Sequence, residues 1–301
     1  MRLNYNQFLA VVYGDLFDWP LTKEEFQEWV IAGDEKNKVG EIGNKDGFYF
    51  LHGRERLIKL RKQREKFSQE KFQKAKKATD LLAKIGAVEG IFLTGSVAVG
   101  NAKKDADIDL LIICSLNTVW LTRLTTVLFL KAKGIYRQSL RASSASWRTA
   151  GLRNWGIAGN LLTHKNKVCP NIFLDTNNLK IKERNLYTAH EVLQAKCLFD
   201  RGGIEKKWLI ENSWTKKYLP NAYQGQKAKI KMQNYNSKIK SFWLAPLELV
   251  TFISQYLYQK PKQTHEKVGW GHAFFHPKNL SERVVSRFNK RLAELKMTKW
   301  V

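Results

Sequence analysis

The fold is decided by residues 93–110, which read LTGSVAVGNAKKDADIDL. An apolar run ends at Leu93, a glycine and a serine follow almost at once, and a second apolar run begins at Ile108. This pattern predicts a strand, a tight turn into a short helix, and then a second strand. Because side chains two apart on a strand point to the same face, Asp107 and Asp109 are expected to project together.

The two aspartates predict a cation-binding site. Two carboxylates side by side repel each other unless a cation lies between them, and oxygen ligands of this kind suit Mg²⁺. Gly95 permits a close approach of the backbone, and Ser96 offers a backbone N–H and a hydroxyl at the start of the predicted helix. The residues therefore predict a metal site at Asp107 and Asp109 beside a phosphate-binding turn.

The segment has the form G-S-x-A-x-G-x5-A-D-I-D-L and resembles the DNA polymerase beta-like nucleotidyltransferase superfamily, in a form close to the minimal and antibiotic-modifying enzymes. The resemblance covers residues 91–114. It implies a small mixed β-sheet core flanked by helices, and transfer of a nucleotidyl group from an NTP to an acceptor with release of pyrophosphate. It also implies that Asp107 and Asp109 hold Mg²⁺ or Mn²⁺, while Gly95 and Ser96 hold phosphates of the NTP.

The family usually adds a third carboxylate on a later strand. No Asp or Glu occurs between Asp109 and Asp175, so Asp175, at the end of a predicted strand over 168–174, is the first candidate for a third catalytic and metal-binding carboxylate. Asp175 fits equally well as a turn residue in the sequence DTNN. Glu191, on the following predicted helix, is a further candidate.

The wider chain predicts an α+β protein in four parts. We expect a winged-helix-like module at residues 1–53, a basic connecting helix at 54–86, the nucleotidyltransferase core at 87–180 and a helical C-terminal domain at 181–301. No repeat and no low-complexity tract interrupts this order.

The first part predicts a helix, a second helix and a hairpin. Residues 3–16 place apolar side chains at near-helical spacing, and Thr22 to Glu25 has the S/T-x-x-E form of a capping box. Asp46 and Gly47 form a turn signal between two short β-prone runs. The order is that of a winged helix, although a clear third helix is missing.

Positive charge dominates the chain, with 52 Lys and Arg against 27 Asp and Glu and a formal net charge of +25. Such an excess favours a polyanionic partner, and we expect nucleic acid, with RNA favoured over DNA. Eleven basic residues within 54–77 fit either a solvated helix that bridges two domains or a nucleic-acid contact.

The acid-free stretch between the two carboxylate positions alternates arginine with tryptophan. The residues concerned are Arg141, Trp147, Arg148, Arg153 and Trp155. They fit either base stacking with phosphate contacts or a surface insertion whose tryptophans face the core.

Other features exclude several classes of protein. Three cysteines without a CxxC pair exclude a disulfide scaffold and a cysteine-based zinc site, and His265, His272 and His276 lack partners at metal-ligand spacing. No apolar stretch supplies the ~20 uninterrupted residues of a membrane span, so we expect no membrane association and a cytoplasmic location.

Taken together, the sequence favours an enzyme that transfers a nucleotidyl group to nucleic acid. One alternative is a nucleic-acid-binding winged-helix regulator with a catalytically silent core. Another keeps the chemistry but transfers the nucleotidyl group to a small molecule or a protein.

Overall fold

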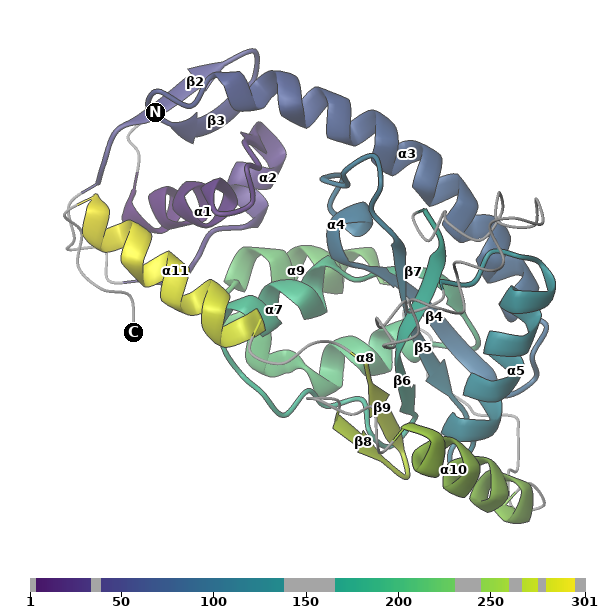
Figure 1. Ribbon diagram of the computed structural model, residues 1–301. Helices are drawn as coiled ribbons and strands as arrows, with labels where there is room; N and C mark the ends of the chain where they lie inside the picture. The colour runs from purple at the N-terminus through teal and green to yellow at the C-terminus, as the bar shows by residue number, and fades with distance from the viewer. Residues whose placement is uncertain are drawn as a thin grey trace, which may run out of the picture.

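Two β-sheets organise the protein, a small one near the N-terminus and a large one at the centre (Figure 1). The structure is a computed structural model, and it describes residues 4–33, 39–137, 166–230, 245–259, 267–275 and 280–295. No helix within these ranges is long and apolar enough to cross a membrane.

The large sheet is mixed. Its strands, in spatial order, are β7 (Lys196–Asp200), β4 (Val88–Thr94), β5 (Ile108–Cys114), β6 (Val168–Asp175), β9 (His272–Phe274) and β8 (Lys267–Gly269). β5 runs antiparallel to β4 and parallel to β6. The crossover from β5 to β6 includes helix α5 (Val119–Ala132), as a parallel connection requires.

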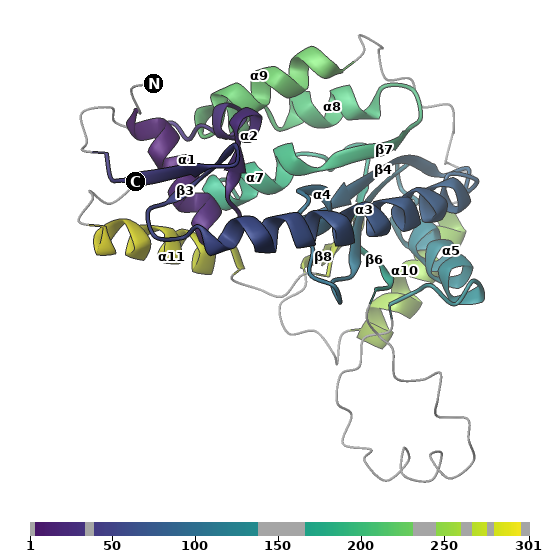
Figure 2. The same cartoon turned by 90° about the horizontal axis from the view of Figure 1, so that it is seen from above.

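The two faces of this sheet carry different helices, and Figure 2 shows the sheet between them. Ile108, Leu110 and Ile112 of β5 pack with α3 (Arg56–Leu82) and α5. The alternate side chains Leu111 and Ile113 pack on the other face, against α7 (Leu186–Gln194) and α8 (Ile204–Glu211). Because side chains alternate along a strand, Asp109 shares the α7 face with Leu111.

The N-terminal part contains α1 (Tyr5–Asp15), β1 (Leu21–Thr22), α2 (Lys23–Glu28), β2 (Ile42–Lys45) and β3 (Phe48–Leu51). The predicted capping box is confirmed, since the Thr22 side chain accepts from Glu25 N at 3.2 Å and Thr22 N donates to the Glu25 carboxylate at 3.0 Å. The predicted hairpin turn is also confirmed, with φ of 53° at Asp46 and 78° at Gly47.

The winged-helix assignment stays a prediction. β1 pairs with β3, which pairs with β2, so the small sheet has the order β1-β3-β2. Between α2 and β2, however, the described residues 30–33 and 39–41 contain no helix. A third helix, which a winged helix places there, is therefore not shown.

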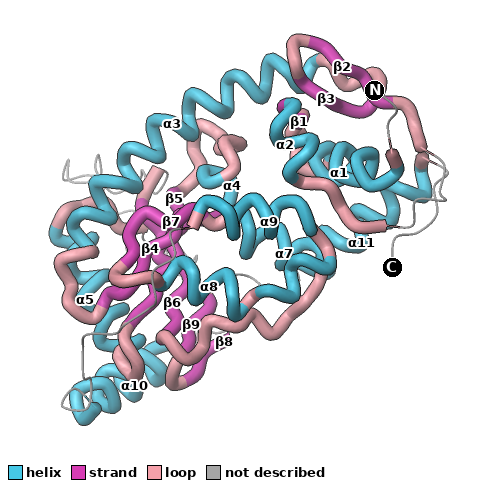
Figure 3. The backbone as a smooth tube through the Cα atoms, turned by 180° about the vertical axis from the view of Figure 1, so that it is seen from behind, coloured by secondary structure: helices cyan, strands magenta, loops and turns pink. Residues whose placement is uncertain are grey.

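The two ends of the chain share one core. Side chains of α1 pack with α7 and with α11 (Leu280–Glu294), and α2 contacts α9 (Pro220–Lys229). Figure 3 shows these helices side by side from behind. The sequence pattern predicts a purely helical region beyond Leu179, and this is wrong. Strands β7, β8 and β9 come from this region and extend the large sheet at both edges.

The helices predicted near the C-terminus have mixed outcomes. The apolar spacing within 181–301 predicts helices over 246–258 and 281–296, and the structure has α10 (Ala245–Gln259) and α11 there. The same spacing predicts one helix over 205–218, where the structure has α8 followed by a 3₁₀ helix, η2 (Ser213–Lys217).

Candidate active site

The aspartate pair lies at the start of β5. Asp109 belongs to the strand, and its Oδ1 accepts a hydrogen bond from Asn171 Nδ2 at 2.9 Å. Asp107 Oδ1 accepts from the backbone N–H of Lys167 at 3.1 Å, and its Oδ2 lies 3.0 Å from Arg137 Nε. Asp107 and Asp109 are both half-buried.

Burial and like charge act together on Asp109. The pKa of Asp109 is raised from its ordinary value of 3.8 to about 7, mainly by burial; attraction to Arg137 opposes this rise and the Asp107 carboxylate adds to it. The structure therefore brings Asp107 and Asp109 close enough to repel each other. A bound cation would relieve this repulsion.

A tight turn at Gly95 lies directly against the pair. Thr94 pairs in register with Asp109, and α4 (Gly95–Ala98) begins at the next residue. Gly95 has a φ of 65°, and a Cβ there would lie 2.9 Å from Asp109 Oδ2. Only glycine combines this backbone conformation with the close approach. Ser96 follows Gly95 as the second residue of α4.

Asp175 is not part of this group. In the parallel pairing of β5 with β6, Asp109 lies opposite Cys169 and Asp175 lies opposite Cys114. Five residues along a strand separate those positions, about 17 Å. Asp175 is 1% exposed and its Oδ1 accepts from Asn177 N at 3.0 Å and Asn178 Nδ2 at 2.8 Å. This position favours the alternative interpretation of Asp175, a residue that holds a turn, over a third metal ligand.

Glu191, the further candidate from the sequence, lies close enough to Asp109 for the two charges to interact. It lies on α7, the helix that covers the Asp109 face of the sheet. Burial and the charge of Asp109 raise the pKa of Glu191 to about 7, and a hydrogen bond with Tyr187 lowers it in part. The sequence does contain a signal for this residue, because Glu191 is the one acidic side chain in the α7 sequence LYTAHEVLQ.

A comparison with protein families matches a nucleotidyltransferase domain to residues 73–130. The chain contains a nucleotidyltransferase domain of the DNA polymerase beta-like superfamily. The matched residues run from the second half of α3 through β4, α4 and β5 to α5, and so include the Gly95 turn and the aspartate pair. A search of curated proteins finds no match.

The domain identifies the protein as a nucleotidyltransferase enzyme, and this family typically uses an NTP and a divalent metal ion. Within the described ranges no three His, Cys, Asp or Glu side chains gather around one metal position. Mg²⁺ is nevertheless commonly bound by only one or two protein carboxylates, and phosphates and waters supply its other ligands. Asn171 Oδ1, buried beside Asp109 without a hydrogen-bond partner, adds a further oxygen. The residues fit the metal.

The basic helix α3 divides into buried and exposed charges. Arg61, Arg64 and Lys71 are buried: Arg61 lies 2.9 Å from Glu25 and 2.8 Å from Glu65, and Arg64 donates to Asn101 Oδ1. Arg64 also donates to Phe17 O, so it links the nucleotidyltransferase domain to the N-terminal part. The exposed basic residues of α3 are Arg56, Lys59, Lys62, Lys66, Lys74, Lys76 and Lys77.

Some predicted features lie outside the described residues. These are Arg141, Trp147, Arg148, Arg153, Trp155, His265 and His276. His272 is described and lies in β9, where burial lowers its pKa.

Proposed function

We propose that the protein transfers a nucleotidyl group from an NTP, with Asp107 and Asp109 holding Mg²⁺ or Mn²⁺ and with Gly95 and Ser96 holding phosphates of the NTP. The observation that carries the proposal is the contact between the Gly95 turn and Asp109, since a Cβ at Gly95 would lie 2.9 Å from Asp109 Oδ2. The contact supports the proposal because a glycine turn beside two carboxylates suits a phosphate and a metal ion at one place.

When bound, the metal ions neutralise the triphosphate and lower the pKa of the acceptor hydroxyl. Arg137, 3.0 Å from Asp107, adds a cation that attracts the same phosphates. Glu191 is the base that accepts the proton of the acceptor hydroxyl at its carboxylate. A pKa near 7, raised by burial, suits a group that takes up a proton at neutral pH.

The test is incubation with each α-labelled NTP, Mg²⁺, and separate pools of RNA, DNA, protein and small molecules, followed by separation of the labelled products. We expect labelled product from the wild type and none from Asp107→Asn or Asp109→Asn. Circular dichroism of the variants shows whether they are folded. Near-normal transfer by either folded variant at matched Mg²⁺ contradicts the metal site.

A second candidate function is nucleic-acid binding, with the core either active on that nucleic acid or silent beside a winged-helix module. Support comes from the net charge of +25 and from the exposed basic side chains of α3. Replacing Lys59 and Lys66 by Gln removes two of them. For single-stranded RNA the slope of log affinity against log salt should become shallower by about 0.7 per lost contact.

The matched control replaces two exposed basic residues of α11, Arg283 and Lys290, by Gln. This control should leave the slope unchanged. An equal change in both double variants, or none in either, contradicts a specific role of α3.

A further inference from the structure

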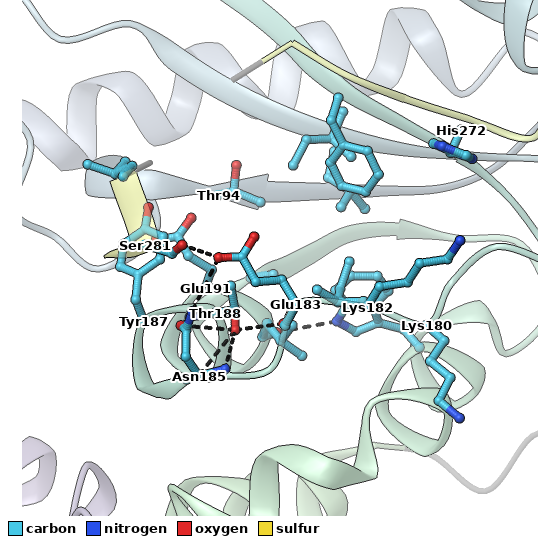
Figure 4. A pocket seen from close by; sticks show the side chains of 18 of the residues that line it. Thr94, Lys180, Lys182, Glu183, Asn185, Tyr187, Thr188, Glu191, His272 and Ser281 are labelled. Atoms are coloured by element: carbon cyan, nitrogen blue, oxygen red, sulfur yellow. Dashed lines mark hydrogen bonds between the residues drawn. The ribbon is translucent and has the colours of Figure 1, made fainter. Parts of the chain in front are cut away.

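A cavity of about 960 Å³ adjoins the catalytic carboxylates on the α7 face of the large sheet. Figure 4 shows Thr94 and Glu191 at one end of it and His272, with Lys180 and Lys182, at the other. Thr94 pairs in register with Asp109, and the charge of Asp109 acts on Glu191. One end of the cavity therefore opens at the carboxylates.

The walls of the cavity are largely apolar. Leu111, Ile172 and Phe274, from three neighbouring strands, form the floor, and Val192 of α7 and Trp208 of α8 face them. Leu111 follows Asp109 by two residues on the same strand face, so the apolar floor continues directly from the carboxylate.

The charge of the lining differs from that of the whole chain. Glu183, Glu191 and Glu282 line the cavity together with two lysines, Lys180 and Lys182, although the chain carries a net charge of +25. A polyanionic strand requires an open, positively charged groove, and this lining does not provide one. Cavities of ~300–1,000 Å³ with apolar walls and a few polar groups are typical of small-molecule sites.

We propose that this cavity is the acceptor site and that the acceptor is a small molecule with an apolar, ring-sized body and a hydroxyl group. The proposal rests on the proposed nucleotidyl transfer. The hydroxyl oxygen forms a bond to the α-phosphorus of the NTP, the bond from that phosphorus to the bridging oxygen breaks, and pyrophosphate leaves. The hydroxyl proton passes to the Glu191 carboxylate.

The exposed basic face of α3 does not compete for this role. α3 packs with Ile108, Leu110 and Ile112, on the sheet face opposite that of Leu111. A nucleic acid bound along α3 therefore lies on the other side of the sheet from the cavity. Binding of nucleic acid and choice of the acceptor are then properties of two separate surfaces.

The experiment uses the full chain with α-labelled NTPs, Mg²⁺ and two acceptor pools. One pool holds 2-(2-naphthyl)ethanol, 2-phenylethanol and cyclohexylmethanol, and the other holds RNA and DNA oligonucleotides with free 3′ hydroxyls. Equilibrium dialysis with 2-(2-naphthyl)ethanol measures binding separately from transfer. We expect labelled alcohols, no labelled oligonucleotide, and naphthylethanol binding that survives in Asp109→Asn.

Ala195→Phe tests the position of the site, because Ala195 lines the cavity and a phenyl ring there occupies part of it. We expect binding and transfer to the alcohols to fall by about tenfold or more, a loss that corresponds to ~1.4 kcal/mol. Ala87→Phe is the matched control, since Ala87 is also half-buried but lies outside the cavity, and it should change neither readout.

The outcomes separate the two proposals. Asp109-dependent release of pyrophosphate without binding or labelling of any alcohol overturns the acceptor site and leaves nucleotidyl transfer standing. Labelled oligonucleotides with unlabelled alcohols overturn it as well, in favour of nucleic acid. Equal binding and transfer by Ala195→Phe and the wild type exclude this cavity as the site. If no NTP is consumed in an Asp109-dependent way, nucleotidyl transfer itself fails.

Discussion

Asp109→Asn should stabilise the metal-free protein while it abolishes transfer. Burial and the neighbouring Asp107 raise the pKa of Asp109 from 3.8 to about 7, so the folded state binds the Asp109 proton more tightly than the unfolded state. The charged form therefore costs folding free energy, and that cost grows as the pH rises from about 4 to 7. Asn keeps the shape of the side chain, and its Oδ1 can accept the hydrogen bond from Asn171 Nδ2.

The magnitude follows from the size of the shift. About three pKa units at 1.36 kcal/mol each give an upper value of about 4 kcal/mol above pH 7. Partial access of water to the half-buried carboxylate reduces this, so we expect a gain of roughly 2–4 kcal/mol for Asp109→Asn at pH 8 in EDTA. Denaturant unfolding at pH 4, 6 and 8 measures it, and the difference between variant and wild type should be small at pH 4.

Mg²⁺ supplies the second half of this test. It should raise the melting temperature of the wild type and leave that of Asp109→Asn unchanged, because only the wild type gains a ligand that relieves the repulsion. Asp80→Asn is the control, since Asp80 is exposed on α3. A less stable Asp109→Asn at pH 8, or a difference that does not change between pH 4 and 8, would refute the assignment of a buried, repelling pair.

Three further substitutions test the remaining parts of the site. Gly95→Ala should cost about 1–2 kcal/mol of unfolding free energy and lower turnover, because Gly95 has a φ of 65° and lies against Asp109. An unchanged rate and melting temperature would contradict the close approach of this turn to Asp109. Glu191→Gln should lower turnover by about 10²–10⁴ with unchanged NTP affinity, and a wild-type rate excludes Glu191 as the base. Asp175→Ala should cost about 1–3 kcal/mol in a denaturant titration and leave turnover per folded molecule intact. A loss of turnover by orders of magnitude in folded Asp175→Ala would return this residue to the metal site.

The strand, turn and strand around the aspartate pair could be predicted because every determinant is local. Gly95, Asp107 and Asp109 lie within fifteen residues, and the alternation of apolar and acidic side chains fixes which face each one takes. The capping box at Thr22 and the turn at Asp46 are local in the same sense. Strand β7 was missed because no glycine or proline separates it from α7, so the helical pattern runs on into it.

The position of a third carboxylate depends on the direction of the strand that carries it. The positions of the acidic residues in the sequence do not show that direction. Had β6 run antiparallel to β5, its C-terminal Asp175 would meet the start of β5, where Asp109 lies. A helix between two strands instead favours a parallel pair of strands. In a parallel pair Asp175, at the end of β6, lies at the end of β5 that is far from Asp109. The helix-forming run over 119–131, between the two strands, thus already gave a reason to look beyond Asp175 for a third carboxylate.

Net charge and site chemistry carry different information in this protein. Several of the basic side chains that give the chain its charge are buried in the fold. Arg61 forms ion pairs with Glu25 and Glu65, and Arg64 donates a hydrogen bond to Asn101. Others lie on the exposed face of α3, away from the Asp109 face of the sheet. The cavity next to the carboxylates is lined by the apolar Leu111 and Val192 as well as by polar side chains such as Thr94 and Thr188, and the proposed acceptor has to fit this lining. A surplus of lysine therefore predicts what the surface attracts, whereas in our proposal the cavity between α7 and the sheet selects the acceptor.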